Sequence, residues 1–220
     1  MEVDKGEALR YLGVGDAQPP EEVLRLVDEA AQLLERAIRP RHVYRVFALE
    51  LRDGVPVLPG AGLTLAGRSA RLMLAECTHA VLLAATLGAD FDALLRQTQA
   101  RDMARAVALD ACGSAGVEWV CDAAEAALRA RFPDKHLTDR FSPGYGDLPL
   151  DIQGALCAAL DAQRRLGLYV TDSCLLNPAK SVTAIIGLAD RPQMRRIRGC
   201  AYCSLAPTCT LRKRGKSCAP

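Results

Sequence analysis

The residues from Arg140 to Tyr145 bring a cation, a rigid turn and an aromatic ring into one short segment. Arg140 carries a planar, permanently charged guanidinium that matches a carboxylate, and Tyr145 offers a ring face and a hydroxyl. Pro143 fixes its own φ, and Gly144 lets a ligand approach the main chain because it has no Cβ. On these residues alone, the segment reads either as a ligand-binding loop or as a surface turn that contains an arginine.

A second group of chemically active residues is a set of four cysteines near the C-terminus: Cys200, Cys203, Cys209 and Cys218. The short gap between the first two lets both sulfurs face one point, and Pro207 and Gly215 allow the chain to fold back with the other two. The irregular spacing favours an iron–sulfur cluster over the paired gaps of a zinc ribbon, and structural zinc remains the alternative. Disulfides rank behind both, because no signal peptide is recognised and the nine cysteines are an odd number. We expect the other five to pack as small hydrophobes: Cys77, Cys112, Cys121, Cys157 and Cys174.

The apolar pattern predicts an α+β fold with a largely antiparallel sheet, because strands and helices mix without regular alternation. Helical spacing predicts helices at residues 7–12, 21–38, 69–76, 89–99, 102–131 and 150–166. Strands are expected at residues 43–51, 55–58, 63–66 and 80–86, with Asp53 and Gly54 at a hairpin turn. Trp119 is expected in the core. The cysteine-rich tail is expected to form a separate part at residues 191–220, after a domain of residues 1–190.

The segment around Arg140 belongs to a longer pattern that extends to Gly187. Arg140 is followed after three residues by Gly144 and Tyr145, then by a helix-like run at 150–166, by Thr171-Asp172-Ser173, and by Pro178-Ala179-Lys180-Ser181-Val182. In this order and spacing, the stretch resembles the activation domain of cobalamin-dependent methionine synthase. It differs at residues 146–151, where the family has a cysteine and a histidine, and at Ile186, where the family tends to place an aromatic residue.

The resemblance implies a domain built on a curved antiparallel sheet flanked by helices, with S-adenosylmethionine held by Arg140, Pro143, Gly144 and Tyr145. It implies reactivation of a corrinoid methyltransferase, with methionine synthase as the first candidate, by methyl transfer during one-electron reduction. Cobalamin would then belong to the partner protein, and an electron donor would be needed. No side chain is expected to act as a catalytic acid or base. Two other functions stay open: an iron–sulfur or zinc-binding scaffold, and an independent methyltransferase.

Composition limits the remaining classes of function. Half of the 220 residues are hydrophobic, which is enough for a core that does not depend on metal. A net charge of +2 is too small to argue for nucleic acid. The apolar run at residues 80–87 is shorter than a membrane span, so we expect a cytoplasmic protein without a membrane partner.

Overall fold

The computed structural model describes residues 2–14, 18–192, 207–213 and 215. Its α-helices are α1 (Lys5–Tyr11), α2 (Glu21–Ala37), α3 (Arg68–Leu74), α4 (Ala89–Gln99), α5 (Met103–Arg131), α6 (Gln153–Leu160), α7 (Ala162–Leu166) and α8 (Thr210–Lys213), with short 3-10 turns η1 (Pro59–Ala61) and η2 (Leu150–Ile152). Its strands are β1 (Arg41–Ala48), β2 (Glu50–Arg52), β3 (Val55–Leu58), β4 (Leu63–Thr64), β5 (Cys77–Thr86), β6 (His136–Leu137), β7 (Tyr169–Val170), β8 (Leu176–Asn177) and β9 (Ser181–Ala189).

The chain divides into two compact units, each assembled from separate stretches of sequence. The first unit comprises Met1–Val43, Ala84–Leu128 and Asp161–Val182, and the second comprises Tyr44–Leu83, Arg129–Leu160 and Thr183–Pro220. Four of the five boundaries between the units fall within β1, β5, α5 and β9, and the fifth lies between α6 and α7. Most helices therefore belong to the first unit, and the larger part of the main sheet belongs to the second.

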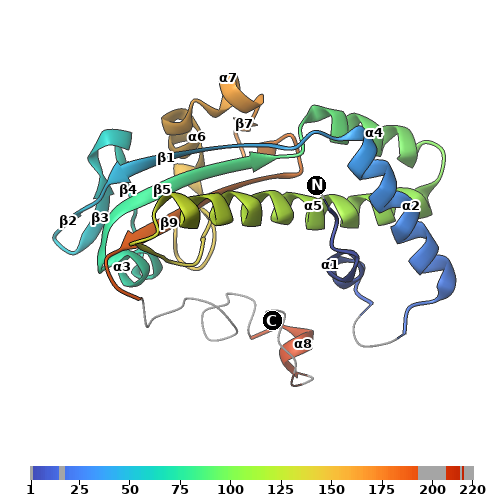
Figure 1. Ribbon diagram of the computed structural model, residues 1–220, viewed down its shortest axis with the longest axis horizontal. Helices are drawn as coiled ribbons and strands as arrows, with labels where there is room; N and C mark the ends of the chain where they lie inside the picture. The colour runs from blue at the N-terminus through green and yellow to red at the C-terminus, as the bar shows by residue number, and fades with distance from the viewer. Residues whose placement is uncertain (1, 15–17, 193–206, 214, 216–220) are drawn as a thin grey trace. The chain divides into compact units, whose positions relative to one another are not determined.

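The main sheet has the strand order β1-β5-β9-β6. β6 pairs antiparallel with β9, and Figure 1 shows β5 running opposite to both β1 and β9. The central strands β5 and β9 are almost continuously apolar and buried, as expected for strands that are covered on both faces. The predicted α+β class with an antiparallel sheet is confirmed.

The predicted hairpin is also confirmed. β2 pairs with β3 in the register Glu50↔Val57 and Arg52↔Val55, and β4 adds a third strand. The two residues between β2 and β3 are Asp53 and Gly54, with φ of 52° and 73°. A two-residue hairpin with both φ values positive is the arrangement that Asp-Gly favours.

The core of the first unit lies between α2 and α5 and includes Phe91 of α4. Small residues let these helices approach closely. Gly113 on α5 is the clearest case, because a Cβ there would lie 2.3 Å from the ring of Phe91. Phe91 and Leu34 are the largest side chains of this cluster that have no exposed surface.

The structure corrects two expectations about helices. The run at residues 150–166 is not one helix, because Asp161 adopts a left-handed φ of 54° and separates α6 from α7. Trp119 is not a core residue, since it is 38% exposed on α5. Within the described part of the chain, no helix combines the length and apolar character needed to cross a membrane.

Candidate functional site

The segment that carries Arg140 is anchored to the main sheet within the second unit. The main-chain N–H of Phe141 donates to the carbonyl of Ile185 on β9 at 3.1 Å, and the N–H of Ile185 donates back at 2.8 Å. Both side chains are buried, with 5% and 0% exposure. Because side chains alternate along an extended segment, Arg140 and Ser142 project away from the side that Phe141 takes.

Main-chain hydrogen bonds close the turn that follows. The N–H of Gly144 donates to the carbonyl of Leu148 at 2.9 Å, and the N–H of Leu148 donates to the carbonyl of Tyr145 at 3.1 Å. The N–H of Tyr145 donates to the carbonyl of Ser142 at 3.0 Å. Gly144 has a φ of +84°, a left-handed value that a residue with a side chain rarely adopts. The turn is therefore held by its own backbone.

The predicted binding residues occupy this one turn with different degrees of exposure. Arg140 is half-buried, Pro143 is buried, and Gly144 is exposed. The side chain of Tyr145 is 46% exposed at the tip. The four residues are thus neighbours in space as well as in sequence, with a cation at the base of the turn and an aromatic ring at its tip.

Asp147 fixes the turn against the beginning of α3. Its carboxylate accepts the main-chain N–H of Arg68 at 2.6 Å and that of Ser69 at 2.9 Å. The hydrogen bond from the Ser69 backbone is the main reason that the pKa of Asp147 lies below its usual value. Gly67 makes room for this contact, because a Cβ at that position would lie 2.6 Å from the Asp147 carbonyl oxygen.

Sequence patterns do not predict this contact. The two partners of Asp147 lie 79 and 78 residues away in the chain, so no local spacing indicates it. The local sequence offers one signal, an aspartate directly after a glycine in a stretch where the chain departs from the activation-domain pattern.

Ile186 lies on β9 with no exposed surface. Its neighbour Gly187 has no room for a side chain, because a Cβ there would lie 2.5 Å from Cys77 Sγ. The main-chain N–H of Gly187 donates to Thr138 Oγ1 at 2.8 Å, and the N–H of Thr138 donates to the Gly187 carbonyl at 3.0 Å. This end of β9 is therefore close-packed.

Of the four predicted metal-binding cysteines, one lies among the described residues. Cys209 is half-buried directly before α8, whereas Cys200, Cys203 and Cys218 lie outside the described residues. Among the described residues, no group of three or more histidine, cysteine or acidic side chains is arranged to hold a metal ion. The tail site stays a prediction.

The cysteines expected to pack as hydrophobes are buried, apart from one. Cys77, Cys112, Cys121 and Cys157 are buried, and Cys174 is half-buried. Burial raises the pKa of Cys112 to about 12 and the pKa values of Cys77 and Cys157 to about 11. These three thiols are protonated at neutral pH and act as apolar side chains.

Comparison with solved structures shows the fold to which these features belong. The chain is similar to the crystal structure of the MetH reactivation domain bound to AdoHcy, with a TM-score of 0.65 and 15% sequence identity. The similarity covers 98% of this chain and 85% of the other. No model of a protein family matches the chain, and no curated protein matches it. The chain therefore has the fold of a reactivation domain, and the resemblance carried by its sequence agrees with this fold.

Proposed function

We propose that this chain binds S-adenosylmethionine at the turn of residues 140–145 and presents it to a corrinoid methyltransferase, methionine synthase or a related protein, during reductive reactivation. The observation that carries the proposal is the likeness of fold along 98% of the chain to a reactivation domain that holds AdoHcy. The sequence pattern from Arg140 to Gly187 adds separate support, because it depends on the order and spacing of residues rather than on the fold.

The geometry of the turn suits the proposed ligand. The Arg140 guanidinium would hold the carboxylate of the methionine moiety through paired, charge-assisted hydrogen bonds. Gly144 is exposed and has no Cβ, so a ligand can approach the main chain there. The exposed ring of Tyr145 would line one face of the ligand or of the corrin. Pro143 is buried and keeps the turn rigid.

The proposed reaction has two steps. An external low-potential donor adds one electron to the partner's cob(II)alamin, which becomes cob(I)alamin. The cobalt electron pair then attacks the sulfonium methyl group, the carbon–sulfur bond breaks toward sulfur, and methylcobalamin and S-adenosylhomocysteine result. No proton is transferred, so the chain needs to supply orientation rather than an acid or a base.

Binding is tested first by calorimetric titration with S-adenosylmethionine. Arg140→Ala should weaken binding by about one to two decades, since a charge-assisted contact contributes about 1.5–3 kcal/mol. Arg52→Ala is the matched control, because Arg52 lies in the β2–β3 hairpin with its side chain 61% exposed. Equal affinities of the Arg140 and Arg52 variants would exclude Arg140 as the anchor.

The reaction is tested by mixing the chain with a corrinoid methyltransferase in the cob(II)alamin state, S-adenosylmethionine and a low-potential reductant. We expect the corrin absorption spectrum to change to that of methylcobalamin, and the change to be slower with Arg140→Ala. If the cobalt spectrum does not change while free homocysteine becomes methylated, the chain is an independent methyltransferase instead.

For the tail, we propose an iron–sulfur cluster held by Cys200, Cys203, Cys209 and Cys218, with zinc as the alternative metal. The support is the spacing of the four thiols and the need for an electron in the proposed reaction. Protein purified without oxygen should contain iron and acid-labile sulfide, and Cys203→Ser or Cys209→Ser should remove both. One zinc ion per chain, without iron, would favour a structural tail and a separate electron donor.

A further inference from the structure

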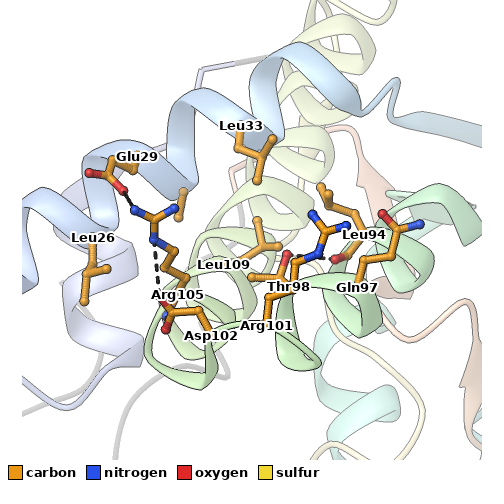
Figure 2. A pocket seen from close by; sticks show the side chains of 11 residues that line it. Leu26, Glu29, Leu33, Leu94, Gln97, Thr98, Arg101, Asp102, Arg105 and Leu109 are labelled. Carbon is orange, nitrogen blue, oxygen red and sulfur yellow. Dashed lines mark hydrogen bonds and ion pairs between the residues drawn. The ribbon is translucent and has the colours of Figure 1, made fainter.

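A cavity of about 430 Å³ lies within the first unit, between α2, α4 and the beginning of α5. Its apolar wall comes from all three segments: Leu26, Ala30, Leu33, Leu94 and Leu109. Figure 2 shows Leu33, Leu94 and Leu109 facing a common space between the helices. The volume lies within the range of about 300–1,000 Å³ that small-molecule sites usually have. The cavity can therefore hold the apolar body of a small ligand.

The charged residues at one side of this cavity neutralise one another. Arg105 contacts Glu29 at 3.0 Å and Asp102 at 3.3 Å. Glu29 also contacts Arg25 at 3.1 Å. Two arginines and two carboxylates thus form one group with no net charge. Because their charges are paired, these four side chains do not favour a ligand of either charge.

Arg101 does not belong to this group of paired charges. It lines the same cavity, and Figure 2 shows its guanidinium beside Leu94, on the other side of Leu109 from the Arg105 contacts. Among the residues that the structure describes, its guanidinium forms no ion pair with a carboxylate. The amide of Gln97 lines the wall next to it. The cavity therefore combines an apolar wall with one uncompensated positive charge and a neutral hydrogen-bonding group.

We infer that this cavity binds a small amphipathic anion, in which an apolar chain or ring carries one carboxylate or phosphate group. The apolar part would lie against Leu33, Leu94 and Leu109, and the anionic group would contact Arg101. A polar anion alone would leave the leucines in contact with water, and an amphipathic cation would meet Arg101 with a charge of the same sign. The site uses none of the residues assigned to S-adenosylmethionine.

The first test is a calorimetric titration of the full chain with octanoate, octyl phosphate and octylammonium. We expect saturable binding of at least one of the two anions and no binding of the cation. The ratio of the two anion affinities tells a carboxylate site from a phosphate site. Octylammonium that binds as tightly as both anions, or an absence of binding by both anions, would overturn the inference.

The second test compares two variants with the same loss of charge. Arg101→Gln should weaken binding of the better anion by about tenfold or more, since it removes a charge-assisted contact. Arg96→Gln is the control, because Arg96 lies on α4 and does not line the cavity. Equal affinity of the two variants would refute the role of Arg101.

A third variant examines the apolar wall. Leu33 is 41% exposed, so Leu33→Glu can be introduced without opening the core. The new carboxylate should reduce binding of both anions at least as strongly as Arg101→Gln does, and unchanged binding would place the ligand elsewhere. Titration of Arg101→Gln with S-adenosylmethionine should give the wild-type affinity, so this inference and the proposed function can fail separately.

Discussion

Removing the Asp147 carboxylate should loosen the contact between the candidate binding turn and α3. In Asp147→Ala, the main-chain N–H groups of Arg68 and Ser69 lose an acceptor that now lies 2.6 and 2.9 Å away. Loss of a side chain that caps a helix beginning typically lowers the free energy of unfolding by about 1 kcal/mol, and by up to about 2 kcal/mol. Because Asp147 is exposed, we expect about 1 kcal/mol. Asp147→Asn keeps one acceptor oxygen and should lose about half as much.

The effect should depend on pH in a defined direction. Folding lowers the pKa of Asp147 below its ordinary value of 3.8. The stabilisation is therefore present above that ordinary value and is lost as the pH falls through the lower folded value. Below that range, this contact should contribute equally to the free energy of unfolding of wild type and of Asp147→Asn.

Urea unfolding measured at neutral and at acidic pH tests both statements. Asp151→Ala is the matched control, because Asp151 is an exposed aspartate four residues later. At neutral pH, Asp147→Ala should unfold at lower urea than Asp151→Ala. Identical midpoints for these two variants would refute the reasoning, and so would a difference between wild type and Asp147→Asn that persists unchanged in acid.

Two further predictions concern the core and the thiols. Gly113→Ala should lower the free energy of unfolding by about 1–3 kcal/mol through overpacking against Phe91, and Phe91→Leu in the same chain should recover part of the loss. Gly154→Ala on α6 is the control and should be neutral or stabilising in urea unfolding, because a Cβ there meets no atom within 4 Å. In alkylation followed by peptide mass spectrometry, the half-buried Cys174 should react before Cys77, Cys112 and Cys157, which are buried and have raised pKa values. Modification of any of these three before Cys174 would contradict their burial.

Local signals predict most of the elements because their causes are local. The Asp53-Gly54 turn depends on two residues that accept positive φ, and the structure has both. The helix expected at residues 89–99 coincides with α4, and the strand expected at residues 80–86 lies within β5. In each case the apolar spacing of one short segment carries the information.

The failures arise where distant or unusual contacts decide the structure. Nothing in the helical spacing of residues 150–166 indicates the left-handed Asp161, which divides α6 from α7. A tryptophan on a long helix suggests a core position, but the place of Trp119 on α5 leaves it 38% exposed. Likewise, Arg140 and its turn can be found from sequence, whereas the Asp147 contact with α3 depends on the fold.

A turn that is closed by its own amides and carbonyls places few demands on side chains over evolutionary time. The hydrogen bonds of Gly144, Tyr145 and Leu148 would survive many substitutions, provided that the two left-handed positions, Gly144 and Gly146, stay glycine. The side chains that still matter are those with contacts outside this hydrogen-bonded turn: the Asp147 carboxylate, which accepts from the N–H groups of Arg68 and Ser69, and the buried side chain of Leu148. A turn closed in this way can therefore occur in chains that share a fold but few residues, as at the 15% identity found with the solved reactivation domain.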